Sequence, residues 1–258
     1  MSAEILKIET AGRVRTLTFN RPDHLNAMNG ALYEDVGDAL RAASAAKDVA
    51  VVILTGEGRA FTAGHDLDEM DNPPVHTDGG QHGFRRFREA LEVFDKPLVA
   101  AVNGLGVGIG LTMLPYCDWV VMDETARVRA PFTTLGVTVE AGNSYLLPAR
   151  VGWANAARLL FTAEWLSAER ALEIGLVQEI ADKGTALAAA RAFAAPIAGM
   201  PVASLVATKR LMLEARNEHV RAAHYREQIA FEEIGKGPAN REALAAFREK
   251  READFSGL

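Results

Sequence analysis

The chain has 258 residues, of which 49% are hydrophobic and 24% are charged, which is an ordinary globular composition. A chain of this length can bury a sizeable core without cross-links, and it has room for one large domain or one domain with an appendage. Its formal net charge of -6, without a basic stripe, argues against nucleic acid as a partner.

The first half of the chain predicts strands and helices in alternation. Residues 5–22 alternate apolar and polar side chains around an Ala-Gly turn, which predicts a β-hairpin. Residues 25–45 place apolar side chains at helical spacing. Short apolar runs at 49–58, 97–104 and 117–123 are typical of buried strands. Repetition over units of roughly 30 residues indicates an α/β fold with parallel strands.

The second half is richer in helix. Residues 156–177 read as helical, with Ser167 as a candidate N-cap and Gly175 as a candidate C-cap. From residue 185 to the end the pattern predicts amphipathic helices, broken at Pro196, at Pro201 and in "GKGP".

This change in pattern suggests two parts. We expect a core domain at 1–195 and a C-terminal helical region at 196–258.

Two glycine-rich turns follow predicted strands, "RAFTAGHDL" (59–67) and "NGLGVGIGLTM" (103–113). Glycines at such places allow tight strand-to-helix packing, and they also allow backbone amides to form an anion site. Each turn by itself leaves both interpretations open. The second turn lacks the G-x-G-x-x-G spacing of a dinucleotide site, and the chain has no P-loop or G-x-S-x-G motif.

Glu140 is a single carboxylate within the apolar stretch "TLGVTVEAGNSYLLP" (134–148). It could be a loop acid that faces water. Alternatively it is buried for a chemical reason, because burying an ionised carboxylate costs several kcal/mol unless it is paired.

Several weaker features bear on location and metals. Cys117 stands in an apolar run and reads as a small core side chain. A chain with one cysteine forms no internal disulfide, and we expect a cytoplasmic protein without signal peptide or membrane span. His76 and His82 lie in a loop rich in glycine and proline, and two histidines there do not indicate a metal site.

Six motifs together resemble one family over essentially the whole chain. They are "NRPDHLNAMN", "FTAGHDLDEM", "KPLVAAVNGLGVGIGLTMLPYCD", "LGVTVEAGNSYLLPARVG", "ERALEIGLV" and "AFREKREADF". In this order and spacing they resemble the enoyl-CoA hydratase/isomerase family of the crotonase superfamily. The resemblance implies an α/β spiral of repeated β-β-α units with a C-terminal helical trimerisation region. It also implies an acyl-CoA substrate, no further cofactor, and a homotrimer or hexamer.

The resemblance assigns roles to both glycine turns. It implies that the backbone N–H groups of His65 and Ile109 hold the thioester oxygen. Such donors stabilise the negative charge that develops there when a neighbouring carbon loses a proton, by several kcal/mol. The side chain of His65 could also line the acyl pocket.

The resemblance likewise implies contacts to coenzyme A. They fall on Ala63, Asp66, Leu67, Phe247 and Lys250, the last two reaching the site of a neighbouring subunit. The family often has a lysine where this chain has Asp68, which puts the phosphate contacts in doubt.

The catalytic carboxylates depart from the hydratase pattern. The two positions that carry glutamates in hydratases of this family are Thr112 and Phe132 here, and both are expected to line the acyl pocket. Glu140 instead matches the single glutamate of Δ3,Δ2-enoyl-CoA isomerases, although Val139 replaces the usual preceding proline. Isomerisation needs one base, so the resemblance favours an isomerase with Glu140 as that base.

Other functions stay open at this stage. The chain could be an enoyl-CoA hydratase, or an acyl-CoA binding protein with little catalysis. A dehalogenating relative has an aspartate nucleophile at the position of Glu140, but a glutamate reaches one methylene further, which disfavours that chemistry.

Overall fold

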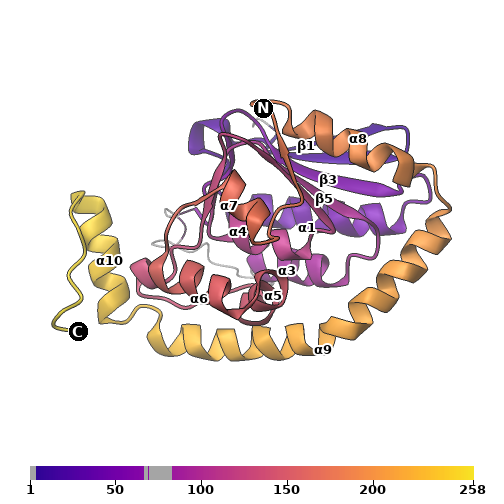
Figure 1. Cartoon of the computed structure of the whole chain (residues 1–258). Helices are drawn as coiled ribbons and strands as arrows, with labels where there is room; N and C mark the ends of the chain where they lie inside the picture. Colours follow the sequence, from indigo (N-terminus) through magenta and orange to yellow (C-terminus); the bar gives the residue numbers. More distant parts are fainter. Residues whose placement is uncertain (1–3, 67–68, 70–82) are drawn as a thin grey trace.

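The computed structural model describes residues 4–66, 69 and 83–258. Leu67, His76 and His82, which carry predictions made from the sequence, lie outside this part. The described strands form two sheets with helices packed around them (Figure 1).

The larger sheet has six strands in the order β1-β2-β3-β5-β7-β10. They are β1 (Leu6–Ala11), β2 (Val14–Phe19), β3 (Val51–Gly56), β5 (Leu98–Val102), β7 (Trp119–Asp123) and β10 (Glu179–Ala181). Strands β1 and β2 pair antiparallel on either side of Gly12, whose φ is +59°, which confirms the predicted hairpin. The other neighbouring strands of this sheet are parallel, as the alternating pattern predicts.

The smaller sheet has four strands in the order β4-β6-β8-β9. They are β4 (Ala60–Thr62), β6 (Leu105–Val107), β8 (Arg127–Arg129) and β9 (Leu166–Ser167). Along the chain, β3, β5 and β7 enter the larger sheet, and the strand after each one enters the smaller sheet. This alternation is the expected spiral of β-β-α units, so the predicted fold class is confirmed.

Nine α-helices complete the described architecture. They are α1 (Gly30–Ala45), α3 (Gly83–Val93), α4 (Ile109–Thr112), α5 (Asn143–Val151), α6 (Trp153–Thr162), α7 (Ala168–Glu173), α8 (Ala186–Ala198), α9 (Val202–Ile234) and α10 (Pro238–Glu249). Three short 3-10 helices lie at Pro22–His24 (η1), Leu114–Tyr116 (η2) and Thr133–Leu135 (η3).

Strand β3 shows why the central strands read as continuous apolar runs. Alternate residues of a strand point to opposite faces of the sheet. Val52 and Leu54 belong to the main core, whereas Val51 and Ile53 pack in a second cluster with Ala190 of α8. All five are fully buried. Burying a side chain of this size stabilises the fold by about 1.5–3 kcal/mol, so both faces favour the apolar sequence.

Two predictions about helices are wrong in detail. The helix expected at 156–177 is divided into α6 and α7 by β9. The predicted cap is correct, since the N–H of Arg170 donates to the hydroxyl of Ser167, and Gly175 follows the helix with φ +79°. Helix α8 continues through Pro196 and ends two residues later at Ala198, since a proline removes only the hydrogen bond of its own N–H and the helix can finish its last turn.

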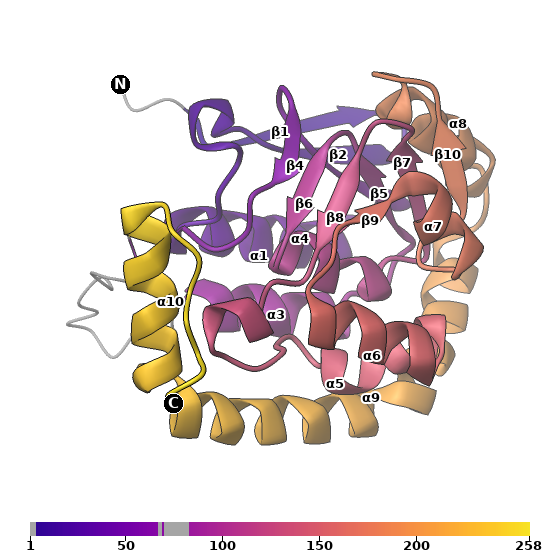
Figure 2. The same ribbon diagram turned by 60° about the vertical axis from the view of Figure 1, so that its left-hand side comes forward.

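The C-terminal helices extend beyond the sheets. Helix α9 has 33 residues and runs along one side of the body, and α10 stands at its far end (Figures 1 and 2). No single helix in the described residues is long and apolar enough to cross a membrane. The pair α8 and α9 meets that test by length and composition only when it is joined across a bend of 108°.

Candidate active site

Two glycine turns touch each other beyond the parallel strands β4 and β6. A Cβ atom at Gly64, whose φ is +95°, would lie 2.7 Å from the carbonyl oxygen of Val107. A Cβ atom at Gly110 would lie 2.9 Å from the carbonyl oxygen of Thr62. Glycine permits this approach because it has no Cβ atom. The two turns are therefore joined backbone to backbone.

His65 and Ile109, the predicted oxyanion residues, lie within these adjoining turns. Ile109 is the first residue of α4, so its N–H has no acceptor inside the helix. His65 forms a strand-like bridge with Met28, whose N–H donates to the carbonyl of Gly64 at 2.7 Å. The fold places the two residues in adjoining turns, and their role toward a thioester stays a prediction.

Glu140 stands immediately before a strained turn. Ala141 has φ +57°, and Gly142, the N-cap of α5, has φ +72°. The hydroxyl of Thr112 donates to Oε1 of Glu140 at 2.5 Å. Oε2 is buried and has no hydrogen-bond partner among the described residues. Glu140 is therefore not a loop acid whose carboxylate faces water.

Burial dominates the ionisation of Glu140 and raises its pKa from 4.5 to about 8. The hydrogen bond from Thr112 opposes this increase and lowers the pKa. The carboxylate of Glu227 raises the pKa, and the cation of Arg88 lowers it. A carboxyl group whose pKa lies near neutral pH can both accept and return a proton, as a general base requires.

An aromatic cluster adjoins this carboxyl group. The ring of Tyr33 lies 5.6 Å from that of His65 and 5.4 Å from those of Phe84 and Phe87, between centroids. Burial and the nearby charge of Glu140 raise the pKa of Tyr33. Tyr33 was not singled out from the sequence, although it belongs to the helix predicted at 25–45.

Thr112 and Phe132, which the family resemblance places at the two hydratase glutamate positions, are both buried. Thr112 is fully buried, and Phe132 is 8% exposed and packs in the main core. Because the hydroxyl of Thr112 binds Glu140, this side chain acts on the ionisation of the acid. Contact of either residue with an acyl chain stays a prediction.

The predicted CoA-binding residues of the first turn have partners within the protein. The carboxylate of Asp66 forms an ion pair with Arg21 at 2.8 Å, and the N–H of Ala63 donates to the carbonyl of Leu25. The carboxylate of Glu69 accepts the N–H of Gly30 at 2.6 Å, at the start of α1. These contacts fix the turn, and binding of CoA by Ala63 and Asp66 stays a prediction.

Phe247 lies in α10, and Lys250 follows this helix directly. Phe247 is 63% exposed, and Lys250 is an exposed residue with φ +55° directly after α10. The Nδ2 of Asn240, near the start of α10, donates to the carbonyl of Leu135 in η3 at 2.8 Å. In both ribbon views α10 stands away from α4 and α5 (Figures 1 and 2).

Two observations on the described residues concern other reactive side chains. Cys117 is 2% exposed and packs in the main core, which confirms its interpretation as a core side chain, and burial raises the pKa of its thiol to about 12. No group of three or more potential metal ligands occurs in residues 4–66, 69 and 83–258.

Known proteins are similar in sequence to nearly the whole chain. The family described as enoyl-CoA hydratase/isomerase matches residues 9–257. A 2,3-dehydroadipyl-CoA hydratase from Escherichia coli is 33% identical over 95% of this chain and 96% of its own. A 1,2-epoxyphenylacetyl-CoA isomerase from the same organism is 30% identical over 95% of each chain.

A solved structure from the same family has a similar fold. An enoyl-CoA hydratase/isomerase from Pseudoalteromonas atlantica superimposes with a TM-score of 0.94 at 38% identity, covering 98% of this chain and 100% of that chain. The two sheets and their paired glycine turns thus define a crotonase-type enzyme fold. The chain belongs to the enoyl-CoA hydratase/isomerase family.

Proposed function

We propose that this protein moves the double bond of an enoyl-CoA from Δ3 to Δ2, with Glu140 as the base. The observation that carries the proposal is the carboxyl group of Glu140. It is buried, accepts one hydrogen bond from Thr112, and has a pKa raised to about 8. Thr112 and Phe132 stand where hydratases of the family carry their two glutamates, so one carboxylate is left for the proposed proton transfer.

In the proposed mechanism the carboxylate of Glu140 removes a proton from C2 of the substrate. The electron pair of the broken C–H bond forms a dienolate, whose negative charge on the thioester oxygen is stabilised by the amides of His65 and Ile109. The protonated Glu140 then delivers its proton to C4, which leaves the double bond between C2 and C3. One acid therefore completes the cycle and is regenerated.

Hydration is the second candidate function, because several relatives are named as hydratases, including the 2,3-dehydroadipyl-CoA hydratase. Addition of water requires a base that activates the water and an acid that protonates carbon. Here Glu140 would have to perform both steps, since neither Thr112 nor Phe132 can act as a base. This requirement favours isomerisation.

The experiment compares a 3-enoyl-CoA with crotonyl-CoA as substrates for the purified protein. We expect formation of the conjugated 2-enoyl thioester from the first and slow hydration of the second. Glu140→Gln should lower isomerisation at least ~100-fold, whereas Glu233→Gln, an exposed change on α9, should not. Equal hydration of crotonyl-CoA would favour the hydratase, and binding without turnover would favour an acyl-CoA binding protein.

We further propose a homotrimer or hexamer in the cytoplasm. Large apolar side chains of the C-terminal helices are exposed in one chain, among them Met212 (59%), Tyr225 (69%) and Phe247 (63%). Neighbouring subunits would cover such surface. In that assembly Lys250 would pair with a phosphate of CoA bound to a neighbour.

A further inference from the structure

One face of α9 packs against the turn that follows Glu140. Val220, His224 and Glu227 are spaced at i, i+4 and i+7, which places them on the same side of the helix. All three are buried, with 1%, 5% and 7% exposed. A Cβ atom at Gly142 would lie 3.1 Å from Val220 and 3.1 Å from His224, so the turn and the helix are in close contact.

The carboxylate of Glu227 binds the first amides of α5. The N–H of Gly142 donates to Oε2 and the N–H of Ser144 donates to Oε1, each at 2.7 Å. These groups have no acceptors inside the helix, so the side chain from α9 satisfies them. Burial raises the pKa of Glu227, and these two donors oppose that increase because they bind the ionised carboxylate, to which hydrogen bonds are the stronger kind.

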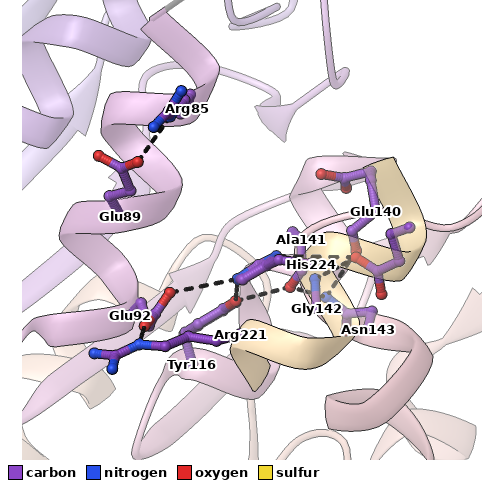
Figure 3. Close-up of polar contacts among 11 residues, drawn as sticks. Arg85, Glu89, Glu92, Tyr116, Glu140, Ala141, Gly142, Asn143, Arg221 and His224 are labelled. Atoms are coloured by element: carbon purple, nitrogen blue, oxygen red, sulfur yellow. Dashed lines mark hydrogen bonds and ion pairs between the residues drawn. The ribbon is translucent and has the colours of Figure 1, made fainter. Parts of the chain in front are cut away.

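Two other side chains hold the same turn by its carbonyl. The hydroxyl of Tyr116 donates to the carbonyl oxygen of Ala141 at 2.8 Å, and Nδ2 of Asn143 donates to it at 3.0 Å. Asn143 also donates to the carbonyl of Thr112 at 2.8 Å, which links the turn to α4. The turn that carries Glu140 is thus fixed from several elements (Figure 3).

His224 does not neutralise Glu227 at neutral pH. Its Nε2 lies 3.1 Å from the hydroxyl of Tyr116, which already donates its proton to Ala141, so we assign the proton on Nε2 to His224. Nδ1 is then a bare lone pair, 3.9 Å from Oε2 of Glu227. Burial lowers the pKa of His224 to about 3, which keeps the ring neutral.

We infer that Glu227 is a positioning residue that fixes the turn carrying Glu140 and, as a second carboxylate, makes Glu140 a stronger proton acceptor. The inference rests on the proposed function of Glu140. According to this inference, α9 contributes a residue to the active site of its own chain, in addition to any contact that it makes with another subunit.

Three other titratable groups lie near Glu140, and their charge states bear on its pKa. Tyr33 from α1 and Tyr116 from η2 have pKa values raised well above 10 by burial, so both stay neutral. Arg88 from α3 is the cation that opposes Glu227, since it lowers the pKa of both carboxyl groups. Removing the charge of Glu227 therefore leaves Arg88 unopposed beside Glu140.

The test is Glu227→Gln, with Glu233→Gln as the matched change on the same helix. Glutamine keeps the shape and one acceptor but loses the charge. We expect the acid limb of the kcat/KM profile for a 3-enoyl-CoA to move to lower pH. We also expect kcat to fall roughly 10-fold or more, because the base is less well placed. Glu233→Gln should keep the wild-type profile.

Three outcomes separate the alternatives. An unchanged limb and an unchanged kcat in Glu227→Gln, together with an inactive Glu140→Gln, would overturn the role of Glu227 and leave the proposed function intact. A purely structural role would lower stability without moving the limb, which also overturns the inference. A fully active Glu140→Gln would instead remove the proposed function.

A measurement on the wild-type protein keeps the inference testable if Glu227→Gln does not fold. Hydrogen exchange of the amides of Gly142 and Ser144 should be slow, because Glu227 holds both. Exchange as fast as that of an exposed loop would contradict the proposed clamp.

Discussion

Replacing Glu140 with glutamine should make the protein more stable at alkaline pH while removing its activity. In the unfolded chain this carboxyl group titrates near 4.5, and in the folded protein its pKa is about 8. Between these values the folded state holds a proton that the unfolded state has released. The free energy of unfolding therefore falls as the pH rises through this window.

The size of the effect follows from the two pKa values. Their difference, about 8 minus 4.5, is about 3.5 units, and each unit corresponds to about 1.36 kcal/mol. The carboxylate thus costs up to ~5 kcal/mol above about pH 8 and nothing below about pH 4.5. Glutamine does not titrate, so the variant escapes this cost.

The assay is urea unfolding of wild type and Glu140→Gln at a fixed protein concentration, from about pH 5 to about pH 9. The stability difference should increase in favour of the variant across this range, while isomerase activity is at least ~100-fold lower throughout. Titrating groups that are not coupled to Glu140 cancel because both proteins share them. A difference that does not change with pH would refute the burial of this carboxyl group.

Four further predictions concern the same site and the assembly. Wild-type kcat/KM should rise with pH with a midpoint near 8, because the base must be ionised, and a flat profile would exclude Glu140 as the base. Thr112→Val should move this midpoint upward, since it removes a hydrogen bond that lowers the pKa, and Thr112→Ser should restore it. Hydration of crotonyl-CoA should be much slower than isomerisation of a 3-enoyl-CoA in parallel assays, and comparable rates would contradict the single-base assignment. Removing residues from 238 onward should weaken acyl-CoA binding and reduce the oligomer size measured by light scattering. An unchanged affinity for acyl-CoA would contradict the proposed link between binding and assembly.

The parts of the fold that could be predicted from the sequence are those whose residues form a recognisable local pattern. The buried strands β3, β5 and β7 read as apolar runs because both faces of the sheet are covered. The strands of the smaller sheet are two or three residues long, too short to show a period. Strand β6 therefore lies inside the stretch 103–113, which the sequence predicts only as a glycine-rich turn.

The same distinction applies to the site. Glu140 could be found because an acid among valines and leucines is unusual, and the family resemblance gave it a role. Glu227 could not be matched to its partners, because 85 residues separate it from Gly142. A weaker signal was present, since His224 and Glu227 share a helical face with the apolar Val220, and polar groups on a buried face need partners.

The contact between the two glycine turns involves different positions from those of the side chains that define the candidate site. The arrangement of the main chain there depends on Gly64 and Gly110 lacking side chains, so substitution at these positions would push the turns apart. The side chains of Thr112, Phe132 and Glu140 are not among the atoms that meet in that contact. A scaffold built in this way can retain one class of substrate while single replacements alter the reaction performed on it.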